Sequence, residues 1–310
     1  MSTAEDRRTM IIALAGATAI SFAPLLYIRS DTTALTGAFY RMFYALPILG
    51  GLVFVSKKED ARDKSSRWLA FGAGILLAID FAGYHTAIDY IGSGIATMIG
   101  NSQVIIVTLA SWWLFGERPN RFILLSLPMV MLGLLLISGI WDDDPFGDDP
   151  VKGVIGGMVA AVFYSSFLIA YRQSNRIAAP AVNAQFDATA GAALGLLILG
   201  TIPPTSLGIE AIDHSITWPS HGWLLFLAIF CQVIGWIAIT YALPRLPAAH
   251  TSFAVLLQPI LTIIWGVIIL NESPSLQQSA GMVLIFAAII AVTLFGATED
   301  SKASIENLEF

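Results

Sequence analysis

Three ionisable side chains lie inside long apolar stretches of the sequence, where a charge is expensive to place. Arg41 falls within the stretch 35–56, and Asp80 and His85 fall within 67–90. If such stretches cross a membrane, each charge needs a partner, water or a functional reason. Asp80 could bind a substrate ammonium or carry a proton, and His85 could titrate near neutral pH. The alternative for both is membership of a packed polar cluster between helices.

Amide and aromatic side chains recur at helical spacing in other apolar stretches. Tyr84 follows Asp80 by four residues, and Trp236 follows Gln232 by four, so each pair shares one helix face. An aromatic wall beside amide groups suits a ligand with an apolar side chain and a zwitterionic head. The alternative is hydrogen bonding between helices, worth about 0.6 kcal/mol per contact. The candidate cavity residues are Asp80, Tyr84, His85, Asn101, Tyr164, Gln232, Trp236 and Gln258.

A second group of residues has gating or structural interpretations. Arg41 either binds a carboxylate or gates the pathway, or it is a structural cation bonded to helix-end carbonyls. Tyr44 follows on the same stretch, and Pro24 removes a backbone hydrogen bond and so can bend its helix. For Asp187, near one end of its stretch, we expect solvation at the membrane interface.

The chain carries no signature of an enzyme, a metal site or a nucleic-acid binder. Its four histidines and single cysteine are widely separated, and no phosphate-binding loop or nucleophile elbow is present. No basic stripe is interleaved with aromatic residues, which argues against nucleic acid. We therefore expect no cofactor and no catalysis, and the sequence carries no signal for an oligomeric state.

The composition predicts a membrane protein. Of the 310 residues, 56% are hydrophobic and only 12% are charged, and the mean hydropathy is +0.74. A helix needs about 20 apolar residues to cross a bilayer. Ten stretches qualify, so we predict an all-helical protein with ten transmembrane helices. They are 10–28, 35–56, 67–90, 93–115, 120–139, 152–172, 182–202, 222–244, 247–270 and 275–297.

The basic residues predict the orientation of these helices. With the N-terminus in the cytoplasm, the segments inside the cell hold most of the lysines and arginines, and the outside segments hold only Arg29 and Lys152. Both termini are then cytoplasmic, and the acidic loop 142–149 lies outside. The expected location is the inner, or cytoplasmic, membrane of the cell, with the lipid bilayer as a partner.

The two halves of the chain resemble each other. Residues 68–119 match 223–274 without a gap, and 10 of these 52 positions are identical, including the closing Glu-x-Pro of Glu117 and Glu272. We interpret these two glutamates as helix-end structure. Five spans per half make the second repeat inverted, and inverted repeats place substrate near the midplane. The predicted units are a first repeat at 1–139, a linker at 140–151, a second repeat at 152–297 and a tail at 298–310.

Three motifs resemble those of a transporter family. Arg41-Met42-Phe43-Tyr44-Ala45-Leu46-Pro47 resembles the second-helix signature of the drug/metabolite transporter superfamily, in its EamA-type branch. Leu114-Phe115-Gly116-Glu117-Arg118-Pro119 and Ile269-Leu270-Asn271-Glu272-Ser273-Pro274 resemble that branch's two helix-end motifs. Within the branch, the chain is most similar to YddG-type exporters of aromatic amino acids. Val104 stands where the family often has a proline.

These observations lead to an expected function with two alternatives. The first expectation is export of aromatic or bulky neutral amino acids and related metabolites, by alternating access through a midplane cavity. The substrate class comes from the resemblance. Proton exchange would use Asp80 or His85, whereas a uniporter would need neither. The alternatives are a broad exporter of drugs, purines or other metabolites, and a non-transporting membrane scaffold.

Overall fold

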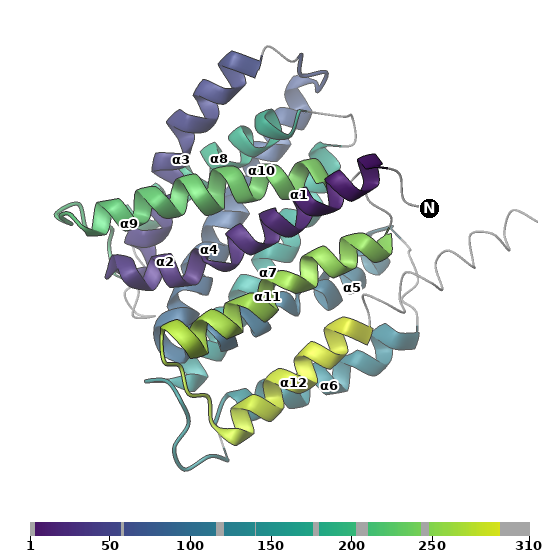
Figure 1. The fold of residues 1–310 in the computed structure, drawn as a ribbon, viewed down its shortest axis with the longest axis vertical. Coiled ribbons are helices and arrows are strands. Elements are labelled where there is room, and N and C mark those ends of the chain that lie inside the picture. Colours follow the sequence, from purple (N-terminus) through teal and green to yellow (C-terminus); the bar gives the residue numbers. More distant parts are fainter. Residues whose placement is uncertain are drawn as a thin grey trace, which may run out of the picture.

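The computed structural model describes residues 4–56, 59–115, 121–139, 141–175, 180–202, 210–242 and 248–291, which fold entirely into helices and connections, without a strand (Figure 1). The helices are α1 (Ala4–Ser21), α2 (Ala23–Ser30), α3 (Ala34–Ser56), α4 (Lys64–Asn101), α5 (Gln103–Phe115), α6 (Arg121–Ile137), α7 (Pro150–Ser174), α8 (Ala181–Thr201), α9 (Ser220–Leu227), the π-helical η2 (Ala228–Gly235), α10 (Trp236–Ala242), α11 (Ala248–Ile269) and α12 (Leu276–Ala291).

The prediction of an all-helical membrane protein is confirmed for the described residues. Six helical segments are long and apolar enough to cross a bilayer by length and composition, and three shorter apolar helices accompany them. The observed helix ends fall close to the predicted ranges. The number of ten spans stays a prediction, because one of the six segments, Lys64–Leu114, covers two predicted spans and other helices are short.

α4 folds back on itself as a helical hairpin, with helical residues on both sides of a turn at Gly92. Gly92 has φ 77° and ψ 168°, a backbone conformation that favours glycine. Thirteen residues of straight helix would separate Tyr84 and Thr97 by about 20 Å, yet the Tyr84 hydroxyl lies 2.7 Å from Thr97 Oγ1. We call residues 64–91 the first limb and residues 93–101 the second limb. The turn falls between the predicted spans 67–90 and 93–115.

Prolines and a π-helix interrupt the other predicted spans. Pro24 lies in the first turn of α2, where its missing N–H costs nothing, so the first span is divided into α1 and α2 rather than bent. Residues 220–242 form one rod that passes from α9 through η2 to α10 (Figure 1). Pro47, Pro128 and Pro259 lie inside helices.

Small residues allow the helices to pack at close range. α4 packs extensively on α7 and on α8. A Cβ on Gly83 would come within 2.8 Å of the Gly156 carbonyl oxygen, so only glycine fits at this crossing of α4 and α7. At the crossing of α1 and α10, a Cβ on Gly16 would lie 2.9 Å from Ala238 Cβ. Close backbone approach through glycine and alanine is typical of helix packing in membranes.

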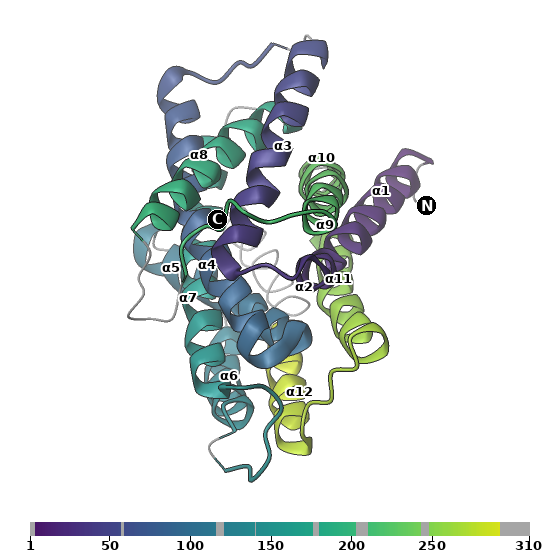
Figure 2. The same ribbon diagram turned by 90° about the vertical axis from the view of Figure 1, so that its left-hand side faces the viewer.

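The helices run roughly side by side, so the bundle has two ends. α6 and α12 pair at one edge, and α3 packs with α8 toward the opposite edge (Figures 1 and 2). One end of the bundle carries the loop 141–149, the turn at Gly92 and the junction of α11 with α12. We call it the acidic-loop end. The other end carries the loop 59–63 and is called the Arg62 end.

Candidate functional site

A central cavity of about 310 Å³ lies between helices of both halves of the chain. Its volume is at the lower limit of the ~300–1,000 Å³ typical of small-molecule sites. Its walls are mainly apolar, with a few converging polar groups. The lining residues come from eight helices: Ala17, Ile20, Ala23, Pro24, Arg41, Asp80, Phe81, Tyr84, Thr97, Gly100, Asn101, Gln103, Tyr164, Leu168, Trp236, Ile239 and Gln258.

Arg41 and Asp80 carry opposite charges on the wall of this cavity but do not form an ion pair with each other. Arg41 is 3% exposed and Asp80 is 8% exposed. The ion pairs between described residues involve Arg62, Arg67 and Lys152, so neither Arg41 nor Asp80 forms one. A buried charge without a partner is costly. The pair therefore fits a ligand that supplies one negative and one positive group.

Neighbouring side chains fix the orientation of Arg41. Its Nε donates to Gln232 Oε1 at 3.0 Å, and its guanidinium carbon lies 4.4 Å from the centre of the Phe81 ring. The amide and the ring face hold the guanidinium by a hydrogen bond and a cation–π contact. A guanidinium placed in this way presents fixed donors, which suits a carboxylate.

Aromatic side chains form the remaining polarisable wall of the cavity. The rings of Tyr164 and Trp236 meet edge to face with centroids 6.4 Å apart. Tyr84 is held by the hydrogen bond of its hydroxyl to Thr97 described above. Together with Phe81, these rings give the cavity an apolar part next to the Arg41 and Asp80 charges. An amphipathic zwitterion would match both parts.

The π-helix η2 determines the positions of Gln232 and Trp236. η2 covers Ala228–Gly235, directly before Trp236, and Gln232 lies within it. π-Helical turns are rare and often occur at functional sites. In this one, Gln232 bonds to Arg41 and Trp236 lines the cavity.

Most of the residues proposed from the sequence meet at this cavity. Its walls contain Pro24, Arg41, Asp80, Tyr84, Asn101, Tyr164, Trp236 and Gln258. Gln232 does not line it but lies behind Arg41, fully buried. The cavity residues that we did not single out include Phe81, Gly100, Gln103, Leu168 and Ile239. Gln103 could have been identified from the sequence, because it aligns with the candidate residue Gln258 in the repeat.

His85 and Tyr44 lie elsewhere. His85 points away from the cavity: its ring stacks on Tyr27 with centroids 4.0 Å apart, and its Nδ1 lies 3.1 Å from the Ala34 carbonyl oxygen. The Tyr44 hydroxyl lies 2.6 Å from His221 Nδ1, at the start of α9. Helix periodicity places a residue on a face but cannot say which neighbouring helix covers that face.

A second, larger hollow lies at the acidic-loop end. This vestibule has a volume of about 650 Å³ and shares no lining residue with the central cavity. Carboxylates from several elements line it, among them Asp31, Asp89, Asp148 and Glu272. Asp89 accepts a hydrogen bond from the Tyr27 hydroxyl at 2.8 Å.

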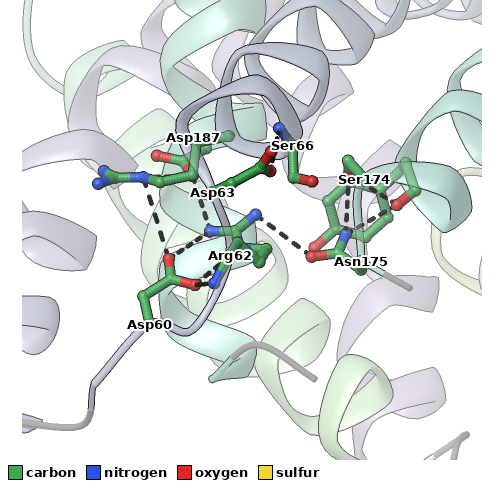
Figure 3. A network of polar contacts seen from close by, with 9 residues as sticks. Asp60, Arg62, Asp63, Ser66, Ser174, Asn175 and Asp187 are labelled. Atoms are coloured by element: carbon green, nitrogen blue, oxygen red, sulfur yellow. Dashed lines mark hydrogen bonds and ion pairs between the residues drawn. The ribbon is translucent and has the colours of Figure 1, made fainter. Parts of the chain in front are cut away.

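A buried ion-pair network joins three elements at the Arg62 end (Figure 3). Arg62 donates through Nε and Nη2 to the two oxygens of Asp60 at 2.9 and 2.7 Å, and through Nη2 to Asp187 at 2.7 Å. The expectation that Asp187 is solvated at the interface is wrong, because it is buried against Arg62. The hydrogen bonds from Arg62 hold the pKa of Asp60 below its usual value.

The described residues contain no group of three or more histidine, cysteine, aspartate or glutamate side chains that could hold a metal ion.

Comparison with known proteins assigns the chain to a family. The family model described as the EamA-like transporter family matches residues 7–139 and again residues 151–294. The chain belongs to the EamA-like transporter family. It is therefore a multi-pass membrane transporter of the drug/metabolite transporter superfamily, which implies a small-molecule substrate and a lipid bilayer around it.

Curated relatives of this EamA-like transporter have similar lengths. It is 24% identical over 260 residues to the uncharacterized transporter YcbK of Bacillus subtilis, covering 81% of this chain and 80% of the relative. It is 25% identical over 266 residues to the uncharacterized inner membrane transporter YhbE of Escherichia coli K12, covering 81% and 76%. A solved crystal structure shares the fold with a TM-score of 0.59 at 18% identity, covering 93% of this chain and 99% of the other.

Proposed function

We propose that this EamA-like transporter exports amino acids with aromatic or bulky neutral side chains, by alternating access through the central cavity. The observation that carries the proposal is the pair of buried, unpaired charges of Arg41 and Asp80 beside an aromatic wall. An α-amino acid supplies a carboxylate for Arg41, an ammonium for Asp80 and an apolar side chain for Tyr164 and Trp236.

Alternating access is supported by pairs of contacts that an inverted repeat would produce. The family matches at 7–139 and 151–294 support two repeats joined by the segment 140–151. At the offset of 155 residues, Gly83 corresponds to Ala238. Gly83 meets Gly156 of α7, and Ala238 meets Gly16 of α1, so the third predicted span of each half crosses the first predicted span of the other half. Rocking of such halves would expose a midplane site to each side in turn.

The orientation is part of the proposal. The distribution of lysine and arginine supports placing the Arg62 end and both termini in the cytoplasm, and the acidic-loop end outside. Export is then movement from the Arg62 end toward the vestibule. Proton coupling would use Asp80, which lines the cavity, rather than His85, which the structure places between Tyr27 and the start of α3.

A counterflow experiment tests the substrate class. The purified protein is reconstituted in liposomes loaded with phenylalanine, and uptake of labelled phenylalanine is followed with and without a pH gradient. Two analogues separate the charges: phenethylamine lacks the carboxylate, and 3-phenylpropionate lacks the ammonium. We expect saturable phenylalanine exchange, strong competition by phenylalanine, and weak competition by either analogue. Acceleration by the imposed gradient would support proton coupling.

Variants connect the flux to the cavity. Asp80→Asn should weaken phenylalanine exchange while improving relative competition by 3-phenylpropionate, because the unpaired carboxylate no longer rejects it. Trp236→Ala should raise the KM by removing aromatic wall area. Asp213→Asn, at an exposed loop carboxylate, is the matched control and should leave the flux unchanged.

The same experiment separates the alternatives. Equal competition by both analogues would favour a broad exporter of drugs or other metabolites, which the apolar walls would also accommodate. No saturable flux of phenylalanine from folded protein would overturn the amino-acid assignment, whereas the family membership already argues against a non-transporting scaffold.

A further inference from the structure

Glu272 is a buried carboxylate that binds to the opposite half of the molecule. It lies in the junction between α11 and α12 and is 8% exposed. Its Oε1 accepts a hydrogen bond from the backbone N–H of Ser93 at 2.5 Å, and its Oε2 accepts one from Gly94 at 3.0 Å. None of the ion pairs between described residues includes it. The carboxylate thus caps the second limb of α4 and not a helix of its own repeat.

Glycines on two helices make room for this carboxylate. A Cβ on Gly94 would lie 3.3 Å from Glu272 Oε2, and a Cβ on Gly266 would lie 2.4 Å from it. At the turn, a Cβ on Gly92 would lie 2.9 Å from Glu272 Cδ. Any side chain at these positions would compete with the carboxylate for space. Together with the two N–H donors, they form a seat that fits a carboxylate.

The seat lies between the vestibule and the central cavity. Glu272 itself lines the vestibule. One turn further along the second limb, Thr97 Oγ1 donates to the Ser93 carbonyl oxygen at 2.7 Å and is hydrogen-bonded to Tyr84, and both Thr97 and Tyr84 line the cavity. The turn that Glu272 caps therefore forms part of the cavity wall facing the acidic-loop end.

The acidic loop rests on the same turn. A Cβ on Gly92 would lie 2.8 Å from an edge carbon of the Phe146 ring. Gln278 of α12 holds the backbone of Phe146 on both sides, accepting from its N–H at 2.8 Å and donating to its carbonyl at 2.9 Å. The loop, α12 and Glu272 thus meet the hairpin turn of α4 as one group.

We propose that Glu272 is the latch of a gate at the acidic-loop end. With the carboxylate in its seat, the α11–α12 junction is bound to the α4 turn and the two hollows are separate. When the carboxylate leaves, the first N–H groups of the second limb lose their acceptor and the junction separates from the turn, which joins the cavity to the vestibule. Glu272 is a positioning residue that lies outside the lining of the central cavity. The inference goes beyond the proposed function and does not depend on which substrate is carried.

Thiol labelling from each side of the membrane tests the latch. The reporter is Ala23→Cys, which replaces a small residue that lines the central cavity. Cys231→Ala removes the single native cysteine. The protein is placed in oriented proteoliposomes, and a membrane-impermeant methanethiosulfonate reagent is added from one side or the other. No substrate is present, so the result is independent of the flux assay.

Two variants release the carboxylate in different ways. Glu272→Gln replaces an acceptor oxygen by a donor opposite a backbone N–H, and Gly266→Ala places a methyl group in the seat without changing any charge. We expect each to raise the labelling rate from the acidic-loop side by about tenfold or more, because hydrogen bonds to a charged group are among the stronger ones in proteins. The rate of labelling from the Arg62 end should stay unchanged or fall.

Two matched control variants each change a single feature away from the seat. Asp148→Asn takes away an exposed vestibule carboxylate, and Gly72→Ala adds a methyl group where no atom lies within 4 Å. Neither should change the labelling rate. An unchanged rate in both latch variants, or an equal rise from both sides, would overturn the proposal, since the second result indicates general loosening. A latch effect without amino-acid flux would leave the gate intact and remove the substrate assignment alone.

Discussion

At the scale of single residues, the site depends on how a few buried charges are held. Among the described residues, Arg41 has a hydrogen-bond acceptor and a ring face but no carboxylate partner, whereas Arg62 has two carboxylates within 2.7 Å. The first arrangement leaves charge available for a ligand, and the second satisfies it within the protein. The same residue type therefore serves binding in one place and stability in the other.

Arg41 should not tolerate replacement by lysine. A lysine keeps the charge but loses the planar fork that can bond Gln232 and a carboxylate at the same time. We expect Arg41→Lys to raise the KM for amino-acid exchange by roughly ten- to a hundredfold, the worth of a hydrogen bond to a charged group. Counterflow kinetics measure this. Arg29→Gln, which removes an exposed cation at the end of α2, is the control. An unchanged KM in Arg41→Lys would exclude direct carboxylate binding.

Removal of Arg62 should destabilise the protein and change its response to acid. Arg62→Ala leaves Asp60 and Asp187 buried with only the half-exposed Arg67 nearby, so we expect a loss of up to about 3 kcal/mol. The low pKa of Asp60 in the folded state gives stability that is present above its unfolded pKa of about 3.9 and lost as pH falls through the folded value.

Thermal unfolding in detergent across a pH series checks both statements. Asp60→Asn should flatten the fall in stability on the acid side, since it removes the titrating group. An equally steep fall in that variant would mean that other carboxylates dominate acid unfolding.

At the scale of the helices, close packing depends on individual glycines rather than on overall composition. Gly74 and Gly72 lie two residues apart on the first limb of α4 and differ completely in their surroundings. A Cβ on Gly74 would lie 2.0 Å from the Ala188 carbonyl oxygen of α8, whereas a Cβ on Gly72 would have no neighbour within 4 Å. We therefore expect alanine substitutions at these two positions to change the stability of the protein in opposite directions.

Gly74→Ala should destabilise the protein and Gly72→Ala should stabilise it. The first forces α4 and α8 apart, which typically costs ~1–3 kcal/mol. The second removes a flexible residue from a helix interior and gains up to about 1 kcal/mol. Thermal unfolding of both variants in one detergent gives the difference. Similar midpoints for the two would show that α4 and α8 do not pack as closely as the structure shows.

At the scale of the whole molecule, the proposed orientation determines which end releases the substrate. In the background Cys231→Ala, the exposed positions Asp148 and Glu59 report on the acidic-loop end and the Arg62 end. We expect an impermeant thiol reagent to label Asp148→Cys in intact cells and Glu59→Cys only after permeabilisation. The reverse pattern would invert the direction of transport that we propose.

The sequence by itself determined the helical membrane architecture, and most of the residues that it proposed for a site lie on the wall of the central cavity. Apolar runs long enough for a bilayer permit little except helices, and a charge such as Asp80 inside such a run is conspicuous. Even the turn at Gly92 falls between two predicted spans, because the apolar run lengths on both sides fit a bilayer.

The tertiary structure alone decided which partner each polar residue found. Helix periodicity gives His85 a face but does not say that Tyr27 covers it, and it places Gln232 on the same stripe as Trp236 although only Trp236 reaches the cavity. Glu272 was interpreted as the end of its own helix, yet it caps a helix about 180 residues away in the chain. Contacts of this kind depend on the relative placement of helices, which no local pattern contains.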